Sequence, residues 1–451
     1  PCVRVFREHR VDLFMHSRLP LLLLASCLAG CHSYTPMPVD LDQHLRDFHR
    51  RTPTASLIKG LRRTDARELA KMFHPDARLA RRRAGVTTAQ RDHAGAWADP
   101  QLQTQLQKIF ETVPHQWVVQ AQLGFTIPIN GRLEKQRNLA NRRNDEELFE
   151  AWAIEQQVAN DVDAAWVDWS AARQQAALFK QTCDNLEKLA ELAQALVDTG
   201  GLSRPGARVF TLEHRQQIAQ RAMANANAQA ARLEVLRRIG LHPDAEIELR
   251  EDLSVAPFES DAERRRKALA NSPRLITQQL QHRTAEANLH LQVRMQWPDL
   301  QFGPLWQEED AQPRPGFGLN LPLPIFTGND PAIAQATAQR EWTAEAWRAA
   351  FEQLLQELAI AEVRHAASAK QATQFHELIG AANQQIEDSR DLASAGQLDA
   401  MLMLDALLRA HNVQMQAIQA DATAAHATIT INTLLTDPLS LEPVLSTGDQ
   451  R

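Results

Sequence analysis

The sequence predicts a mainly α-helical protein that also carries a few β-strands and is built from two tandem repeats. Three observations predict this architecture. The same order of anchor residues occurs twice, about 195 residues apart, and four short segments alternate apolar with polar residues. Two stretches of this chain, which has 22 prolines, contain no proline over a length far beyond an ordinary helix. Together these patterns indicate two copies of a unit in which short strands adjoin a very long helix.

Paired proline and glycine anchors define the repeat. The pairs are Pro75 with Pro273, Pro100 with Pro298, Gly124 with Gly318, and Gly201 with Gly396. Their offsets are 198, 198, 194 and 195 residues, and their order is the same in both halves of the chain. A single match of glycine or proline would be chance, but several matches in one order at nearly one offset indicate an internal duplication.

Four segments have the two-residue period of a β-strand: 101–107, 119–127, 300–303 and 317–323. One face of each is apolar, and the other is uncharged, polar or small. A transmembrane barrel needs that division, with lipid outside and water inside, but the smallest such barrels have about eight strands, so several chains would have to assemble. A half-buried sheet packed on helices has the same alternation. The adjoining helices favour the barrel, because they are too long to cover so small a sheet.

Two proline-free stretches predict the long helices. No proline occurs between Ile129 and Pro205 or between Pro331 and Pro438, and both stretches are rich in Ala, Gln, Glu, Leu and Arg. In the first stretch, apolar residues recur every three or four positions, as in a coiled-coil seam. These residues are Ile154, Val158, Val162, Ala165, Trp169, Ala172, Leu186, Leu189, Leu192 and Leu196. About 65 helical residues would extend roughly 100 Å.

Each long helix is expected to turn back on itself. The first turn is predicted at 199–203, where glycine supplies left-handed geometry, with a return helix at 208–239 whose start Arg204-Pro205-Gly206 should break. The second copy predicts a helix at 332–392, a candidate interruption at Gly380, a turn at 395–397 and a return helix at 398–435. Each copy therefore reads helix, strand, strand, long helix, turn, helix.

The amino terminus has the features of an export signal with a lipoprotein cleavage site. Arg18 precedes an apolar run at 19–24, which leads to Leu28-Ala29-Gly30-Cys31. We therefore expect Cys31 to become the first residue of the mature chain, with a thioether-linked diacylglycerol and an amide-linked acyl chain. A single acyl chain binds membranes only marginally and reversibly, whereas three chains anchor stably. An uncleaved membrane helix would need about 20 apolar residues, more than this run provides.

The predicted signal sets the segment boundaries. A start at Met15 would place a basic segment, the apolar run and the cleavage site in the usual order, so residues 1–14 are expected to lie upstream of the true start. Cleavage before Cys27 would leave a very short signal. His32 follows Cys31, and the absence of aspartate there is expected for sorting to the outer membrane. The predicted segments are a signal at 1–30, an anchor segment at 31–58, the first repeat at 59–250, the second repeat at 251–437 and a tail at 438–451.

Composition limits the possible partners. The formal charge of −6 becomes about −8 when residues 1–30 leave with four basic and two acidic groups, so no basic footprint for nucleic acid exists. Of four cysteines, Cys31 and Cys183 would remain, and acylation of Cys31 leaves no pair for an internal disulfide. No segment after Cys31 approaches the length of a transmembrane helix. A mature chain that crosses a membrane would therefore have to do so as strands.

Patterns of catalytic and metal-binding residues are missing from the sequence. His376-Glu377 lacks the second histidine of a zinc-binding helix. Three further histidines show no ligand spacing, namely His365, His411 and His426. No nucleophile with a base and no phosphate-binding loop is present. The sequence therefore predicts no enzyme, no metal site and no cofactor other than the covalent lipid on Cys31.

Junction and turn motifs carry a resemblance to a known family. The motifs are the lipobox at Cys31, the paired Pro75 and Pro273, the strand-to-helix junctions 125–132 and 319–328, and the turn Gly396-Gln397-Leu398-Asp399 leading to Leu404-Asp405-Ala406. With these motifs in this order and spacing, residues 31–437 resemble the outer-membrane factors of the TolC type, specifically lipoprotein members that serve tripartite efflux pumps.

The resemblance implies a homotrimer in which three chains build a 12-stranded transmembrane β-barrel on a 12-helix periplasmic α-barrel. It implies a passive duct across the Gram-negative outer membrane. Small solutes would arrive from a periplasmic adaptor, or membrane fusion, protein and an inner-membrane pump such as a resistance-nodulation-division transporter. The helix turns would contact the adaptor. The residues concerned are Gly200, Gly201, Leu202 and Ser203 in the first copy and Gly396, Gln397 and Leu398 in the second.

The resemblance also places acidic residues at the closed periplasmic aperture. Asp405 lies in the matching Leu-Asp-Ala segment, and Asp399 lies three residues after the turn glycine. Leu402 occupies the position where some relatives have a second acidic residue, which leaves a double ring in doubt. A ring of aspartates would favour cations and resist full closure by mutual repulsion. Alternatively, both are solvated carboxylates near a helix amino end, where the helix dipole favours them.

One rival class has the same anchor and helical hairpins. A structural or adaptor coiled-coil lipoprotein without a pore would not need four alternating strands or a duplication in register. The exported solute is not identified by any residue pattern, because metal ions, drugs and other small molecules use such ducts.

Overall fold

The computed structural model describes residues 34–51, 59–110, 117–256, 266, 268–309, 312–394 and 399–435. The chain forms two compact units, Pro1–Arg50 and Arg51–Arg451. In the first unit, Asp40 caps helix α3 (Leu41–His49), because its carboxylate accepts hydrogen bonds from the first backbone N–H groups. The predicted lipidation site Cys31 and the predicted turn residues Gly396, Gln397 and Leu398 lie outside the described residues.

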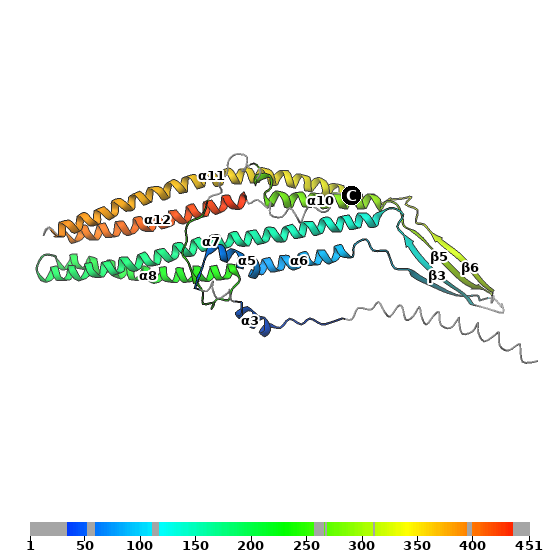
Figure 1. The fold of residues 1–451 in the computed structure, drawn as a ribbon, viewed down its shortest axis with the longest axis horizontal. Coiled ribbons are helices and arrows are strands. Elements are labelled where there is room, and N and C mark those ends of the chain that lie inside the picture. The colour runs from blue at the N-terminus through cyan, green and yellow to red at the C-terminus, as the bar shows by residue number, and fades with distance from the viewer. Residues whose placement is uncertain are drawn as a thin grey trace, which may run out of the picture. The chain divides into compact units, whose positions relative to one another are not determined.

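The second unit contains the predicted succession of elements twice (Figure 1). The first copy has helices α5 (Arg63–Phe73) and α6 (Pro75–Asp92), strands β2 (Gln101–Lys108) and β3 (Trp117–Ile127), and helices α7 (Arg132–Asp198) and α8 (Arg204–Ile239). The second copy has helix α10 (Pro273–Arg294), strands β5 (Leu300–Glu309) and β6 (Gln312–Asn320), and helices α11 (Asp330–Ser394) and α12 (Ala400–Leu434). The predicted order of helices and strands is confirmed in both copies, with α5 as an additional helix ahead of α6 in the first copy, and the predicted turn at 395–397 lies outside the described residues.

The helices form a layer with two open edges. Helix α7 has 67 residues and α11 has 65, so each extends roughly 100 Å. Helix α7 packs on both α8 and α12, and α12 packs on α11, so α8 and α11 lie at the edges of this part of the layer. In the part of the layer that adjoins the strands, the helices lie side by side in the order α6, α7, α10, α11. Both helical hairpins therefore lie on one side of the strands, as Figure 1 shows.

The four strands form one antiparallel sheet in the order β2-β3-β5-β6. The first two strands lie where the alternation predicts them. In the second copy the predicted ends were wrong, since β5 continues beyond Gly303 to Glu309 and β6 ends at Asn320 rather than Leu323. Pro304 lacks an N–H group, but it interrupts the ladder only locally, because β3 and β5 keep one offset on both sides of it. Pro322 and Pro324 remove donors beyond Asn320 and end β6.

The first helix turn corrects the prediction that Arg204-Pro205-Gly206 breaks the start of the return helix. Helix α8 begins at Arg204, and Ser203 caps it by accepting the N–H of Gly206 at 3.2 Å. Proline is tolerated in a first helical turn because the N–H that it lacks would have no partner there. The turn itself closes at Gly200, whose φ of 79° is left-handed.

Gly380 does not interrupt the second long helix, contrary to the prediction. Helix α11 continues through it from Asp330 to Ser394. A glycine inside a helix costs about 1 kcal/mol relative to alanine. The alanines that flank it, Ala381 and Ala382, are the best helix formers and favour continuation.

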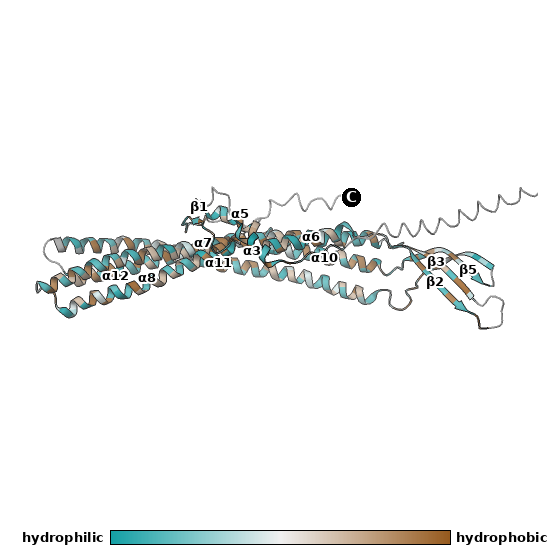
Figure 2. Ribbon diagram, turned by 90° about the horizontal axis from the view of Figure 1, so that it is seen from below, coloured by the Kyte–Doolittle hydropathy of each residue, from teal (hydrophilic) through white to brown (hydrophobic). Residues whose placement is uncertain are grey.

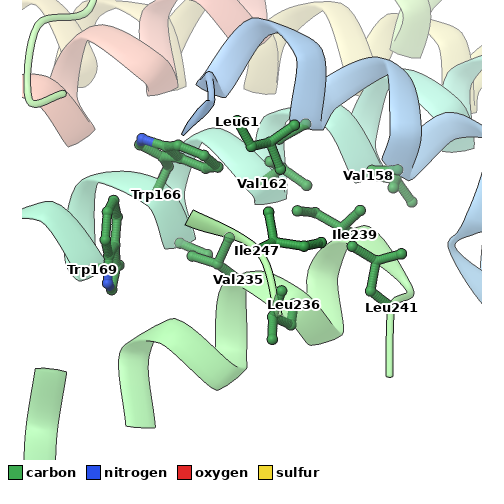
Figure 3. Close-up of a cluster of buried hydrophobic side chains, with 13 residues drawn as sticks. Leu61, Val158, Val162, Trp166, Trp169, Val235, Leu236, Ile239, Leu241 and Ile247 are labelled. Atoms are coloured by element: carbon green, nitrogen blue, oxygen red, sulfur yellow. The ribbon is translucent and has the colours of Figure 1, made fainter. Parts of the chain in front are cut away.

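The largest buried cluster lies where α7 and α8 pack beneath a small parallel sheet. That sheet pairs β1 (Lys59–Leu61) with β4 (Glu248–Leu249), two strands too short for periodicity to reveal. Figure 3 shows side chains from α7 and α8 pointing toward one another. The cluster includes Leu61, Val158, Val162, Ala165, Trp166, Trp169, Val235, Leu236, Ile239, Leu241 and Ile247. Burying each large apolar side chain contributes about 1.5–3 kcal/mol, which fixes the hairpin at this level.

The predicted coiled-coil seam is confirmed in its first part and incomplete in its second. Val158, Val162 and Trp169 are buried, whereas Leu192 is 39% exposed and lies off the seam. Figure 2 shows apolar and polar residues interleaved along the long helices. Among the described helices, none combines the length and the hydropathy that crossing a bilayer requires.

Candidate pore wall and helix-turn tip

The sheet has two chemically distinct faces, because side chains alternate along each strand and the register places residues of one kind opposite one another. The polar face carries Gln101, Gln103, Gln105, Gln107, Gln120, Gln122, Thr126, Gln301, Gln307, Glu309, Gln312, Arg314 and Asn320, with Gly124, Gly303, Gly316 and Gly318, and with Val118 and Leu305 as its large apolar residues. The apolar face carries Leu102, Thr104, Leu106, Lys108, Trp117, Val119, Ala121, Leu123, Phe125, Ile127, Leu300, Phe302, Pro304, Trp306, Glu308, Pro313, Pro315, Phe317 and Leu319.

Glutamines form one row across the polar face. Gln105 pairs with Gln120, Gln120 with Gln307, and Gln307 with Arg314, so this row spans all four strands. A glutamine side chain has two N–H donors and a carbonyl acceptor. This face can therefore form hydrogen bonds with water or with a polar solute of any charge.

The apolar face is widely exposed. Leu102, Phe317 and Leu319 are 70, 84 and 72% exposed, although their neighbours on this face are also apolar. A contiguous apolar surface of this kind marks contact with a membrane or with a protein partner. The sheet thus has an apolar face suited to contact with lipid and a polar face suited to contact with water.

The far end of the helical layer brings the predicted tip residues together. The turn residue Leu202 packs in one cluster with Phe210 of α8 and with Ala400 and Leu404 at the start of α12. The first turn and the beginning of the second return helix therefore lie at one end, as the repeat predicts. Met401 and Leu402 are 44 and 40% exposed at this end, so it also presents apolar surface.

The two predicted gate residues have different local roles. The carboxylate of Asp399 accepts the N–H groups of Met401 and Leu402 at 3.0 and 3.2 Å and so caps α12. Asp405 accepts a hydrogen bond from Nε of Arg409 at 2.7 Å, and its side chain is 49% exposed. An exposed ion pair between neighbouring helical turns contributes about 0.3–0.5 kcal/mol. Asp405 therefore keeps a solvent-accessible charge that its own helix partly compensates.

Two of the three histidines without ligand spacing, His411 and His426, contact residues of another helix. Nδ1 of His411 on α12 lies 2.9 Å from the hydroxyl of Thr182 on α7. Nε2 of His426 on α12 lies 2.7 Å from the carboxylate of Asp168 on α7. Spacing within the sequence could not identify these pairs, because each joins residues more than 200 positions apart. Within the described residues, no group of three or more histidine, cysteine, aspartate or glutamate side chains could hold a metal ion.

A second polar cluster that the sequence did not reveal lies beside the large buried core. Asp163 of α7 contacts Arg67 and lies 3.6 Å from Nε of Arg63. Arg63 also approaches Asp252 at 3.7 Å and donates to the carbonyl of Ser254 at 2.6 Å. Burial raises the pKa of Asp163, and the two arginines oppose that shift. The cluster ties the linker between the repeats to α5 and α7.

Solved structures of bacterial membrane channels share this architecture. A membrane protein from Pseudomonas aeruginosa superposes with a TM-score of 0.70 at 15% identity, over 85% of this chain and 92% of that one. The CmeC outer membrane channel of Campylobacter jejuni gives 0.69 at 10% identity, over 90 and 94%. The MtrE outer membrane channel of Neisseria gonorrhoeae, in its open state, gives 0.68 at 14% identity, over 87 and 95%. No protein-family model and no curated protein sequence matches the chain.

The chain therefore has the fold of TolC-type outer-membrane efflux channels. The mainly helical, two-repeat architecture predicted from the sequence is confirmed, and so is the resemblance at the level of the fold.

Proposed function

We propose that this protein is the outer-membrane exit duct of a tripartite efflux or export system and conducts small solutes passively. The observation that carries the proposal is the open-edged protomer with one polar and one apolar face. Strands β2 and β6 each have one unpaired side, and helices α8 and α11 each have one uncovered side in the described packing. The unpaired N–H and C=O groups of a strand edge can form hydrogen bonds with another strand, and a sheet closed into a barrel has no free edge.

Assembly of identical copies into a ring would close both the sheet and the helical layer. Three copies of the 4-stranded sheet would give 3 × 4 = 12 strands, an even number within the range of outer-membrane barrels. The same rotation would join α8 of one copy to α11 of the next and close the helical layer. In such a homotrimer the apolar face would contact outer-membrane lipid, and the polar face would line the pore.

The proposed location is the Gram-negative outer membrane, with the helical layer in the periplasm. The names of the structural relatives describe outer membrane channels, which supports this location for a chain of the same fold. The proposed diacylglycerol and acyl chain on Cys31 would add a lipid anchor beside the barrel. No catalysis is assigned, because transport through such a duct needs no covalent step.

The proposed partners are a periplasmic adaptor protein and an inner-membrane pump such as a resistance-nodulation-division transporter. The adaptor would contact the helix turns, at Gly200, Gly201, Leu202 and Ser203 in the first copy and at Gly396, Gln397 and Leu398 in the second. Exposed Met401 and Leu402 support an apolar contribution to this contact.

We assign the aperture charge chiefly to Asp405. Three copies of its exposed carboxylate would repel one another in a ring, and Arg409 of the same helix would reduce that repulsion. Asp399 would add charge at the same end, although its carboxylate is engaged as a helix cap. The ring would favour cations and bias the aperture against full closure.

Single-channel recording tests the duct and the gate together. The full mature protein, purified in detergent, is reconstituted in planar bilayers, and wild type is compared with Asp405→Ala. Discrete conductance that rises in the variant is expected. Stable insertion with unchanged conductance would remove Asp405 from the gate and leave the duct. A folded preparation without conductance would instead favour a structural coiled-coil lipoprotein that has no pore.

A further inference from the structure

The polar face of the sheet carries two charged residues within the described strands, and they neutralise each other. Glu309 ends β5 and Arg314 lies in β6, and Nη1 of Arg314 donates to Oε2 of Glu309 at 2.8 Å. The other polar groups on this face of the described strands are amides and one hydroxyl, which carry no charge. The net charge of the face is therefore zero.

Two glycines on the polar face lie where other groups approach their backbone closely. A Cβ atom added to Gly303 of β5 would collide with the backbone carbonyl of Leu123 on β3. A Cβ atom added to Gly318 of β6 would collide with the side-chain amide of Gln122, which reaches across β5 from β3. Glycine inside a strand marks such close approach and permits strong curvature. Curvature toward the polar face at these glycines would let further copies, added at the edges, enclose that face.

We propose that the strand section of the duct is a glutamine-lined pore that does not select solutes by the sign of their charge. The inference rests on the proposed duct function and names the solutes that the strand section admits, namely small polar solutes that form hydrogen bonds, whether cationic, anionic or neutral; the proposed cation preference of Asp405 belongs to the aperture at the other end. Rings of charged side chains select ions in channels. Here Glu309 cancels Arg314 in every copy, and the glutamine side chains offer both donors and acceptors.

Glu309 and Arg314 are then the residues that keep this section neutral. Removing either partner would leave one uncompensated charge in each copy, and these charges would have the same sign all around the pore. Arg314→Gln would leave Glu309 uncompensated and favour cations, whereas Glu309→Gln would leave Arg314 uncompensated and favour anions. The effect should weaken with salt, because the screening length falls from about 10 Å at 0.1 M to about 3 Å at 1 M.

The experiment measures reversal potentials of the full mature protein in planar bilayers under a potassium chloride gradient. Relative to wild type, Arg314→Gln is expected to shift the reversal potential toward that of potassium, and Glu309→Gln toward that of chloride. The double variant is expected to return to the wild-type value, because the face is neutral again. Both single shifts should shrink when the same gradient ratio is formed at higher salt.

Glu308→Gln is the matched control. Glu308 is adjacent to Glu309 in β5 and has the same chemistry, but it lies on the apolar face opposite Pro313. Its removal should leave the reversal potential unchanged, since its charge would lie outside the pore wall. A shift in Glu308→Gln equal to that in Glu309→Gln would overturn the assignment of the faces.

Two further outcomes separate the inference from the proposed function. Open channels whose reversal potential is the same in wild type and both single variants would overturn neutral compensation and leave the duct intact. Folded protein without channels would overturn the duct itself, and the inference with it.

Discussion

The hydroxyl of Thr182 lies 2.9 Å from Nδ1 of His411, and this buried pair joins the long helix of the first repeat to the return helix of the second. His411 is 6% exposed, and the centre of its imidazole lies 4.8 Å from the centre of the Phe179 ring. Burial lowers the pKa of His411 from its ordinary value, and Glu213 of α8 opposes the shift. The buried contact between the two hairpins therefore favours the neutral imidazole.

Acidification is expected to weaken the packing of α12 on α7. The pKa of His411 is lower in the folded than in the unfolded chain, so the unfolded state binds the proton more readily as the pH falls below about 6.5. The free energy of unfolding should decrease from that point until the folded-state pKa is passed, and then level off. Thermal unfolding of wild type and His411→Gln at several pH values measures the pH-dependent stability that His411 contributes. Glutamine is the suitable replacement because it can still form a hydrogen bond with Thr182 but does not titrate.

Other groups also titrate in this range, so the comparison needs a control. His290 of α10 is exposed, and His290→Gln removes a histidine outside the seam. The loss of stability between about pH 8 and about pH 5 should be smaller in His411→Gln than in wild type and in His290→Gln. Equal losses in all three proteins would contradict the assigned role of His411.

The sequence could predict the elements but not these ties between them. Proline-free stretches and the repeat offset located α7, α8, α11 and α12, since local propensity and periodicity decide where long helices form. Thr182 and His411 meet across 229 positions, and nothing in the spacing of either residue indicates the other. The same holds for β1 and β4, which are held by the packing around them rather than by strand periodicity.

Prolines account for two of the local errors. Pro205 reads as a helix breaker, but it stands in the first turn, where its missing N–H costs nothing. Pro304 reads as the end of a strand, but pairing with β6 continues past it. The effect of each proline depended on its position within a helix or strand, and that position cannot be deduced from residue type alone.

Of the predicted site, the tip geometry and the two sheet faces follow from the sequence pattern. The charge pair of Glu309 and Arg314 could be found only from the pairing register of the strands.

Asp163→Ala is expected to destabilise the protein by about 3 kcal/mol, because it removes the carboxylate from Arg67 and leaves Asp252 as the acidic neighbour of Arg63 in a site that is mostly buried. The side chains of Asp163 and Arg63 are 11 and 14% exposed, so solvent can replace little of the lost interaction. Chemical denaturation of the detergent-solubilised protein measures the change. Asp65→Ala removes an aspartate whose partner Arg62 is 70% exposed, and it should cost less than about 1 kcal/mol. Similar losses for both variants would contradict the special role of Asp163.

Two substitutions can separate the role of Asp399 as a helix cap from the effect of its negative charge. Asp399→Ala should lower stability by about 1 kcal/mol, since the N–H groups of Met401 and Leu402 lose their acceptor. Asp399→Asn should keep the stability of wild type, because the amide oxygen accepts the same bonds, while the negative charge is gone. Thermal unfolding measures the cap, and the conductance of Asp399→Asn beside that of Asp405→Asn measures each charge. A larger conductance change at Asp399 would move the main aperture charge to that residue.

Gly303 is predicted to be the least replaceable glycine of the sheet. A methyl group there would collide with the carbonyl of Leu123, so Gly303→Ala must separate β3 from β5 or shift their register, at a cost of about 1–3 kcal/mol. Gly316 lies in β6 on the same polar face, and a Cβ atom added to it meets nothing within 4 Å. Gly316→Ala should therefore behave as wild type in the fraction of protein that survives limited proteolysis in membranes, whereas Gly303→Ala should be degraded. If both variants resisted proteolysis equally, the close approach of β3 and β5 would not be needed for the stability of the sheet.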